Sequence, residues 1–505
     1  MVFNSWEFAL FFPFVIFLFF AFPFRYRWII LLVASYVFYM AWRVEYILLL
    51  IFSTCIDYWA SNQMSKKSTK NERKPYLYVS ILSNLGLLFS FKYLDFFASS
   101  FNYVFPSTLQ IPLMHLVLPM GISFYTFQTL SYSIDVYNGE IKAEKHLGIF
   151  AVFVSFFPQL VAGPIERASN LLPQFREKHF FDEKRIKLGL QLMAWGFFKK
   201  LVIADRVAIV VNQVYNSPSD FSGLSIWIAS ILFAFQIYCD FSGYSDIAIG
   251  AAQVMGYNLM KNFDRPYFSK SISEFWKRWH ISLSSWFKDY VYIPLGGNRT
   301  VKWRWYYNLF ITFLISGVWH GANWTFVIWG ALHGFYLIAA LQIQPISNWI
   351  YSKFSISKES LFYKFFHISI TFFLVLVAWV FFRANNVSDA FLILEKSVEG
   401  NFLAQIKDLF LPFKETFIRF STAYLKSDLT LQNQNLGIKF YEFLITLFGL
   451  FIMETVHFLQ RNHSLREEIS KLHWILRWGL YYAFIASIIF LGSFGEASTF
   501  IYFQF

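Results

Sequence analysis

Long apolar runs recur along the whole chain, and they constrain its fold more than any other feature. The hydrocarbon core of a bilayer is about 30 Å thick, so a spanning helix needs about 20 residues. Hydrophobic residues make up 57% of the 505 residues and charged residues only 15%, whereas soluble domains hold about 45–50% and about 25%. A soluble core of this size does not hide that much apolar surface, so the sequence predicts an all-α, polytopic membrane protein.

Apolar runs of suitable length predict about ten to twelve membrane helices. Several runs are short, and these are candidates for re-entrant or half-spanning helices. We interpret the first run as a span and not as a signal peptide, because it has no basic region before it and no small-residue cleavage site. The candidate spans are Phe8–Phe24, Trp28–Trp42, Tyr46–Ala60, Leu77–Phe97, Leu113–Leu130, Leu147–Ala162, Leu188–Val211, Ile226–Gly250, Asn308–Gly330, Phe362–Phe382, Phe440–Phe458 and Trp474–Gly492.

Basic residues give the chain a net charge of +12, and they cluster in short loops between the candidate spans. Cytoplasmic loops of membrane proteins carry such an excess, and anionic headgroups attract it. The distribution therefore indicates topology and lipid contact, and it argues against nucleic acid as a partner. Arg25 and Arg27 lie two spans before the most basic loop. Loops separated by two spans lie on the same side of the membrane, so both basic segments are expected to be cytoplasmic. This predicts an N-terminus outside the cytoplasm. That loop contains Lys66, Lys67, Lys70, Arg73 and Lys74.

Two polar regions interrupt the apolar pattern, at residues 343–361 and 383–436. We expect the first to be a short connection, and the second to form surface helices. Neither region is typical of an independent domain, and the chain has no internal repeat or low-complexity linker. The sequence therefore predicts one membrane domain over residues 1–505.

A third polar region, between about 257 and 307, is rich in tryptophan but too polar to span a membrane. If Ser273–Tyr290 form one helix, their aromatic residues share an arc of about 120° and the charged residues lie opposite. This pattern predicts an amphipathic helix at the membrane interface. His280 falls at the border of the apolar arc, where it either supports a site or is an ordinary border residue.

The segment 308–330, NLFITFLISGVWHGANWTFVIWG, holds His320 in the middle of an apolar run. Polar groups in hydrocarbon are costly and usually face the bundle interior or a water-filled cavity. As one helix, the segment places His320 on the same face as Ser316 and Asn323, and Gly317 beside them opens space for a substrate. The alternative is a histidine that only hydrogen-bonds a neighbouring helix.

General base catalysis is the chemistry that best suits His320, because a neutral imidazole accepts a proton near pH 7. The ring would activate a hydroxyl or thiol for attack on an acyl carbonyl. Asn323, one turn along, is placed to orient the ring or to donate to an oxyanion. By helical phase His333 points away from this face, and we interpret it as structural.

Asp240 lies late in an apolar run, in the segment QIYCDFSGYSD. A carboxylate at membrane depth needs a partner, and Arg265, Lys277 and Arg278 are within sequence reach. We favour a structural ion-pair network here over catalysis.

The segment QLVAGPIER contains Gly163–Pro164, which breaks a hydrophobic run. Non-helical backbone at membrane depth is tolerated only inside protein or along a cavity. Arg167, at the end of this segment, is therefore a candidate to line the site or to bind a substrate phosphate.

Several common catalytic motifs are absent from the sequence. It has no P-loop, GxGxxG, HExxH or GxSxG, so ATP hydrolysis, nicotinamide chemistry and an elbow-type serine hydrolase are unsupported. The two cysteines, Cys55 and Cys239, lie in apolar runs and predict neither a disulfide framework nor a zinc site. We expect no metal cofactor.

The polar and aromatic motifs together resemble the membrane-bound O-acyltransferase family, in its bacterial alginate O-acetyltransferase branch. They are long and ordered, they cover almost the whole chain, and the core motifs lie at residues 115–335. The motifs are MVFNSWEFALFFPFVIF, LLVASYVFYMAWR, VLPMGISFYTFQTLSYSIDVYNG, FFPQLVAGPIER, YCDFSGYSDIAIG, SISEFWKRWHISLSSWFKDYVYIPLGGNR, SGVWHGANWTFVIWGALHG, WVFFRA and FIYFQF.

This resemblance implies a bundle of about eleven spans around a central funnel, with interfacial and re-entrant helices. It implies His320 as the catalytic histidine and His280 as the second, supporting one. In this branch, acetyl groups move across the bacterial inner membrane from a cytoplasmic donor, acetyl-CoA. Periplasmic partners of the SGNH-hydrolase type then often complete the transfer to the polysaccharide. The other supporting candidates are Asn323, Ser316, Arg167 and Asp240.

Three functional hypotheses follow from these patterns. The first is an O-acetyltransferase for an alginate-like envelope polysaccharide, with either the glycan or a partner's serine as the direct acceptor. The second is a transporter or flippase of envelope precursors, in which the polar face around His320 lines the path. The third is an O-acyltransferase of the same fold that acts in D-alanyl transfer to teichoic acids, or on a lipid or protein acceptor.

Overall fold

The computed structural model describes residues 1–105, 109–400, 440–461, 464–494 and 500–501. The regular secondary structure of these residues is helical, with no β-strand among them, which confirms the predicted fold class. Seven of the described helices are long and apolar enough to cross a membrane. The chain is therefore a multi-pass membrane protein, and the expected number of about eleven spans stays a prediction.

The predicted spans with the longest uninterrupted apolar runs coincide with these helices, Ile226–Gly250 and Phe362–Phe382 among them. Two other predicted spans are wrong in part. Leu113–Leu130 begins as non-helical chain, and the helix there starts only at Ile122; Pro119 lacks the N–H that a helix interior requires. Leu147–Ala162 is helical only as far as Ser155.

The residues form two compact units. Unit 1 comprises Met1–Gly196, Tyr244–Asp264 and His280–Leu295, and unit 2 comprises Phe197–Gly243, Arg265–Trp279 and Gly296–Phe505. The prediction of a single domain over residues 1–505 stays a prediction. The long helix α11 (Gly223–Met255) contributes residues to both units, up to Gly243 in unit 2 and from Tyr244 in unit 1.

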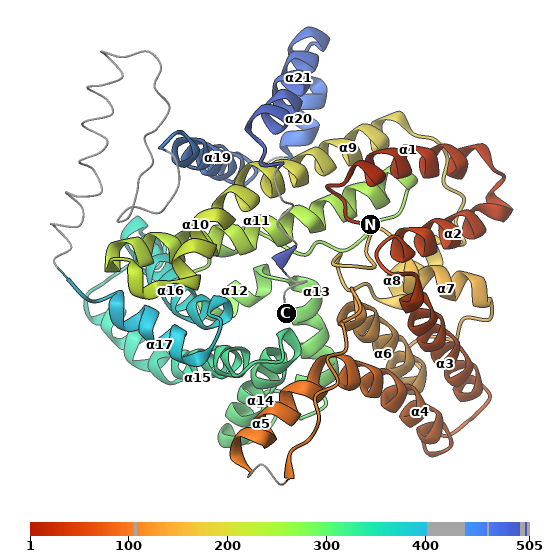
Figure 1. The fold of residues 1–505 in the computed structure, drawn as a ribbon, viewed down its shortest axis with the longest axis horizontal. Coiled ribbons are helices and arrows are strands. Elements are labelled where there is room, and N and C mark those ends of the chain that lie inside the picture. The colour runs from red at the N-terminus through yellow and green to blue at the C-terminus, as the bar shows by residue number, and fades with distance from the viewer. Residues whose placement is uncertain (106–108, 401–439, 462–463, 495–499, 502–505) are drawn as a thin grey trace. The chain divides into compact units, whose positions relative to one another are not determined.

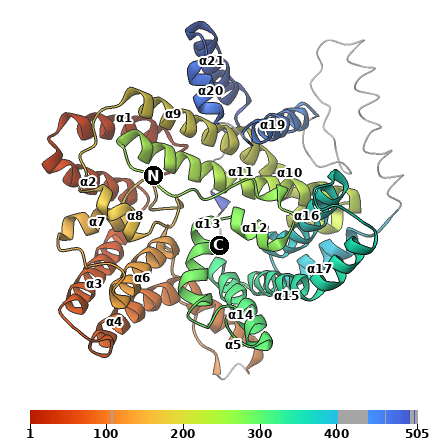
Figure 2. The ribbon, with the colours of Figure 1, turned by 180° about the vertical axis from the view of Figure 1, so that it is seen from behind.

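Unit 1 is built from the N-terminal helices and one short later helix. They are α1 (Trp6–Ala21), α2 (Arg27–Met40), α3 (Ile47–Ser65), α4 (Lys70–Leu88), α5 (Leu94–Val104), α6 (Ile122–Asn138), α7 (Leu147–Ser155), α8 (Ala168–Gln174), α9 (Glu183–Phe197) and α13 (Ile281–Phe287). Helices α3, α4 and α6 pack side by side (Figures 1 and 2).

A buried polar cluster joins these three helices. The Asp57 carboxylate on α3 accepts hydrogen bonds from Ser80 Oγ at 2.5 Å and from Asn84 Nδ2 at 2.9 Å, both on α4. Asn84 Oδ1 accepts from Ser53 Oγ at 2.6 Å and from Thr129 Oγ1 on α6 at 3.4 Å. Buried polar groups need such partners where water is excluded, so this cluster fixes how α3, α4 and α6 meet.

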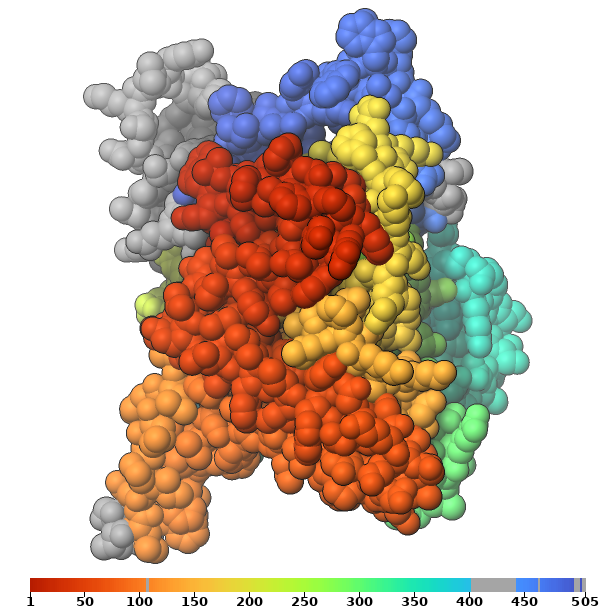
Figure 3. Space-filling model, turned by 90° about the vertical axis from the view of Figure 1, so that its right-hand side faces the viewer, coloured from red at the N-terminus to blue at the C-terminus, as the bar shows by residue number. Residues whose placement is uncertain are grey.

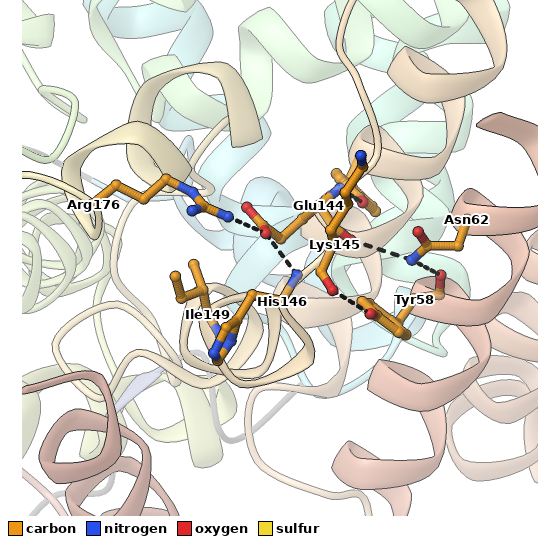
Figure 4. A network of polar contacts seen from close by, with 8 residues as sticks. Tyr58, Asn62, Glu144, Lys145, His146, Ile149 and Arg176 are labelled. Atoms are coloured by element: carbon orange, nitrogen blue, oxygen red, sulfur yellow. Dashed lines mark hydrogen bonds and ion pairs between the residues drawn. The ribbon is translucent and has the colours of Figure 1, made fainter. Parts of the chain in front are cut away.

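The polar link between α6 and α7 is held by side chains from other parts of unit 1 (Figure 4). Tyr58 on α3 donates to the Lys145 carbonyl at 2.6 Å, and Asn62 donates to the Glu144 carbonyl at 3.2 Å. The buried Glu144 carboxylate pairs with Arg176 and accepts from the His146 N–H at 2.8 Å. The link is therefore an ordered part of the unit although its sequence is polar.

Helix α1 shows how the apolar surplus of the sequence is distributed. One stripe of the helix is buried, at Phe8, Phe12, Val15 and Phe19. The opposite stripe, which includes Trp6, Leu10 and Phe14, is exposed; α1 belongs to the red surface in Figure 3. An exposed apolar surface of this kind suits lipid contact.

Unit 2 holds most of the helices that are long enough to span. Its helices are α10 (Asp205–Asn216), α12 (Ile272–Arg278), α14 (Lys302–His320), α15 (Trp324–Lys353), α16 (Leu361–Arg383), α17 (Val387–Lys396), α19 (Phe440–Leu459), α20 (Leu465–Lys471) and α21 (Trp474–Leu491). Helices α14 and α15 pack together, and α15 also packs on α16 (Figures 1 and 2).

The structure agrees with the sequence prediction for one of the two polar regions of the C-terminal half, as far as it is described, and differs for the other. Residues 343–361 are not simply a connection, because α15 continues to Lys353. Residues 383–400 contain the predicted surface helix as α17, which begins at an Asn386 cap whose side chain accepts from the Asp389 N–H. The rest of the region, residues 401–436, lies outside the described residues.

Candidate active site

His320 is the last residue of α14, at the point where the chain turns into α15. The predicted continuous span Asn308–Gly330 is therefore wrong. Gly321 adopts extended backbone with φ −164° and ψ 153°, and Asn323 does the same, so the helix ends and a new one begins. Ser316 lies one turn before His320 on α14, and both side chains are buried.

Glycines on the two helices allow α14 and α15 to approach closely. A Cβ added at Gly330 on α15 would lie 3.0 Å from the Cα of Gly317 on α14, which is inside ordinary van der Waals contact. A Cβ at Gly317 would meet the backbone of Phe326 on α15. The expectation that Gly317 opens space for a substrate is therefore wrong, because the partner helix fills that space.

Aromatic rings surround His320 within unit 2. Its imidazole makes edge contacts with Trp329 at 4.8 Å, Trp319 at 4.9 Å and Phe382 at 5.3 Å between ring centroids. Trp329 lies on α15 and Phe382 on α16, so three helices form these walls. The arrangement buries the imidazole among aromatic rings from three helices.

Asn323 has a structural role that the sequence pattern did not reveal. Its Oδ1 accepts from the Thr325 N–H at 3.0 Å, which caps α15, and its Nδ2 donates to the Asn385 carbonyl at 3.1 Å. The helical projection that placed Asn323 on the face of His320 does not hold, because the helix ends between them. A supporting role of Asn323 at His320 stays a prediction without that geometric basis.

His333 lies on α15 and is completely buried. Its Nδ1 accepts a hydrogen bond from the indole N–H of Trp276 at 3.2 Å. Its ring lies 4.9 Å from Trp329, whose indole also contacts His320. This hydrogen bond to an aromatic neighbour supports the structural interpretation of His333.

His280 lies in unit 1, in a break between α12 and α13. The predicted continuous helix Ser273–Tyr290 is wrong, because His280 adopts φ 43° and ψ 56° in the left-handed region. Non-glycine residues rarely occupy this region, and those that do cluster at functional sites. Burial lowers the pKa of His280 to about 3, so the ring is neutral at physiological pH.

The tryptophans of this segment are buried in protein rather than presented along one exposed face. Trp276 and Trp279 are buried in unit 2, where Trp279 lies 5.0 Å from Trp379. Trp286 is buried in unit 1, stacked on Phe127 at 3.9 Å with its N–H donating to the Phe127 carbonyl. The predicted interfacial amphipathic helix is therefore wrong: the apolar arc packs into the protein.

Arg167 lies in unit 1 at the end of the non-helical stretch between α7 and α8, as the Gly163–Pro164 break predicted. Its guanidinium pairs with Asp289 at 2.9 Å and lies 4.5 Å from the ring centroid of Tyr290. The neighbouring Glu166 is buried and accepts from Asn170 Nδ2 at 2.7 Å. Burial raises the pKa of Glu166 to about 7. The role of Arg167 toward a substrate stays a prediction.

Asp240 is buried in unit 2 as part of an ion-pair network, but its partner is not among those expected. The ammonium of Lys200 lies 2.7 Å from Asp240 and 2.8 Å from Asp205, and all three side chains are buried. Asp240 Oδ2 also accepts the N–H of Ile501 at 2.7 Å. The predicted partners Arg265, Lys277 and Arg278 are wrong; Arg278 pairs instead with Glu274 at 2.6 Å.

The sequence patterns did not identify the residues that enclose the two histidines. Trp329 and Phe382 at His320 were visible only as apolar residues of spans, and Asn262 beside His280 carried no signal. Across the described ranges, no group of three or more His, Cys, Asp or Glu side chains is placed to hold a metal ion.

Comparison with known proteins gives consistent matches. The model of the MBOAT, membrane-bound O-acyltransferase family, matches residues 145–382. The probable alginate O-acetylase AlgI of Pseudomonas aeruginosa is 40% identical over 402 residues, which are 77% of this chain and 73% of that protein. The peptidoglycan O-acetyltransferase of Helicobacter pylori is 38% identical over 74% of each chain. A teichoic acid D-alanyltransferase of Bacillus subtilis is 31% identical over 44% of this chain and 58% of its own.

Proposed function

The chain belongs to the membrane-bound O-acyltransferase family, and we propose that it is a membrane O-acetyltransferase that acts on a cell-envelope polysaccharide. The relatives that match most of its length support this substrate class, since they are an alginate O-acetylase and a peptidoglycan O-acetyltransferase. The teichoic acid D-alanyltransferase covers less than half of the chain, so acetyl is the better supported acyl group.

The surroundings of His320 carry the proposal. A buried imidazole at a helix end, enclosed by Trp319, Trp329 and Phe382, lies inside the matched region. Titratable side chains held in buried, apolar surroundings are characteristic of functional sites, where proton transfer needs such a group.

We assign His320 the role of general base. Its neutral ring takes the proton of the acceptor hydroxyl as that oxygen attacks the acetyl carbonyl. The carbon–sulfur bond then breaks and the donor leaves as a thiolate, and His320 returns the proton to that sulfur. Acetyl-CoA supplies the acetyl thioester in this scheme. A positioned base of this kind contributes about 10²–10⁴-fold to the rate.

We place the protein in the bacterial inner membrane with its N-terminus on the periplasmic side, from the basic loop at Lys66–Lys74 and the positive-inside rule. Acetyl would enter from the cytoplasmic face. The acceptor is either the glycan or a serine of a periplasmic partner of the SGNH-hydrolase type. Ser316 and His280 are supporting candidates in this scheme.

The test follows acetyl transfer in membranes that contain the full chain. Labelled acetyl-CoA is supplied, and hydroxylamine-labile label in the envelope polysaccharide is measured. His320→Gln is expected to lower transfer by about 10²–10⁴-fold at an unchanged protein level. The exposed His473 provides a matched control, because His473→Gln removes an imidazole at the start of α21. Full transfer by the His320→Gln protein would contradict the assignment.

A further inference from the structure

The side chain of Asn262 is buried in unit 1 and contacts three polar side chains. Its Nδ2 donates to Ser245 Oγ at 3.1 Å, and its Oδ1 accepts from Ser282 Oγ at 2.9 Å. The same Oδ1 lies 3.1 Å from Nδ1 of His280. Asn262 thus links Ser245 on α11 to His280 and to Ser282, which follows it at the start of α13.

The orientation of the Asn262 amide is fixed by a backbone donor. The N–H of Ser282 points to Oδ1 at 3.3 Å, and an N–H does not bind the NH₂ end of an amide. The atom that faces His280 is therefore the oxygen, which only accepts. Two acceptors 3.1 Å apart would repel, so Nδ1 of His280 carries the hydrogen.

The rest of the contacts agree with this assignment. Ser282 Oγ lies 3.4 Å from Nδ1, and because its own hydrogen goes to Asn262 it can accept a share of the Nδ1–H. A buried imidazole with a pKa near 3 is neutral and carries one hydrogen. With Nδ1 protonated, Nε2 is the acceptor nitrogen of the ring.

The position of the ring is also held. The backbone carbonyl of Asn262 accepts the Ile281 N–H at 2.9 Å, directly after the left-handed residue His280. Phe124 and Phe263 flank the imidazole with interplanar angles of 24° and 25°. Backbone strain is retained only where the surroundings over-determine it, and Asn262 contributes contacts through both its backbone and its side chain.

We infer that Asn262 is a positioning residue that holds His280 in the Nδ1–H tautomer, so that His280 presents Nε2 as a proton acceptor. Resting on the proposed function, this inference gives the second histidine a defined role. His280 accepts a hydrogen bond or proton from a hydroxyl and does not donate one to the acyl oxygen. Ser282 and the two phenylalanines beside the ring do not titrate near neutral pH.

The tautomer is tested without any assay of activity. Protein labelled with ¹⁵N-histidine is reconstituted in lipid, and ring nitrogens are distinguished by their couplings to carbon-bound ring hydrogens. Among the ten histidines, the His280 signals are those lost in His280→Gln. We expect a protonated Nδ1 and an unprotonated Nε2. An Nε2–H tautomer in the wild-type protein would overturn the inference.

Two variants test the consequence for acetyl transfer from labelled acetyl-CoA. Asn262→Leu removes the acceptor for Nδ1–H and lets the two tautomers of His280 mix. A catalytic imidazole in the wrong tautomer lowers kcat by up to about 10⁴-fold. We therefore expect acetyl transfer to fall by at least about 10-fold. Asn262→Asp keeps an acceptor and adds a negative charge that favours the imidazolium, so the acid limb of the pH profile should move to higher pH.

A matched control is Asn258→Asp, which adds the same charge at an exposed side chain four residues away. It should leave the pH profile unchanged. An equal shift in both aspartate variants would overturn the local role of Asn262. If the wild-type protein has the Nδ1–H tautomer but transfers no acetyl, the proposed function fails while the assignment of Asn262 stands.

Discussion

Replacement of Gly330 by alanine tests how closely the position of His320 depends on the contact between α14 and α15. The added Cβ would lie 3.0 Å from the Cα of Gly317 and closer still to the Phe313 carbonyl, where ordinary contact begins at 3.4 Å. The contact with the Phe313 oxygen, at 2.4 Å, is the shorter of the two, so the helices must part by about 1 Å to restore ordinary contact. Backbone atoms on the α14 side leave no flexible side chain to move instead.

The expected magnitudes follow from that displacement. Overpacking a tight contact costs about 1–3 kcal/mol of unfolding free energy. His320 lies three residues beyond Gly317 on α14, so the imidazole moves with the helix. A misplacement of about 1 Å is worth about 10²-fold in rate, so the displacement predicts a loss of acetyl transfer of up to about 10²-fold.

The assay compares Gly330→Ala with Gly479→Ala in the same unit. Gly479 lies inside α21 with open space where its Cβ would be, so alanine there should keep activity and gain up to about 1 kcal/mol from helix propensity. Thermal unfolding in detergent and acetyl transfer in membranes are measured for both. Unchanged transfer and stability in Gly330→Ala would refute the reasoning that the glycine contact positions His320.

Three further predictions concern polar side chains. Lys200→Met removes the ammonium between Asp205 and Asp240 and should cost about 3–5 kcal/mol of unfolding free energy. Lys200→Arg keeps a positive charge and should cost less. A methionine variant as stable as the wild-type protein would contradict the prediction. Glu166 has a folded pKa of about 7, above its ordinary 4.5, so between these values the unfolded chain binds fewer protons and stability falls as pH rises. Glu166→Gln should abolish that fall between pH 5 and 8 in unfolding measurements, and parallel pH curves for the two proteins would disprove it. Asn323→Ala should lower the unfolding free energy by about 1 kcal/mol because α15 loses its cap, whereas Asn323→Ser keeps the cap. An equal loss of acetyl transfer in both variants would show that Asn323 has a role beyond capping.

The span Phe362–Phe382 was predictable because its apolar run is uninterrupted, and α16 follows it closely. The segment around His320 was harder, since its helix break occupies only Gly321–Asn323 between two apolar runs. The signal was present as a glycine followed by an asparagine cap, but the apolar pattern outweighed it.

The surroundings of His280 could not be derived from local pattern. Neither glycine nor proline marks the break there. The left-handed backbone of His280 occurs together with contacts to Asn262 and the flanking rings, which are distant in the sequence. The partner of Asp240 was missed for a related reason. Lys200 lies 40 residues earlier inside an apolar run, and periodicity carries no information about which buried charges meet.

The hydrogen bond from the Ile501 N–H to Asp240 joins residues 261 positions apart, and this has a consequence for biogenesis. At a synthesis rate of about 5–20 residues per second, roughly 10–50 s pass between the addition of Asp240 and that of its partner. During this interval Asp240 lacks the N–H that it accepts in the folded protein. The hydrogen bonding of Asp240 in unit 2 is therefore completed only after residue 501 has been synthesised.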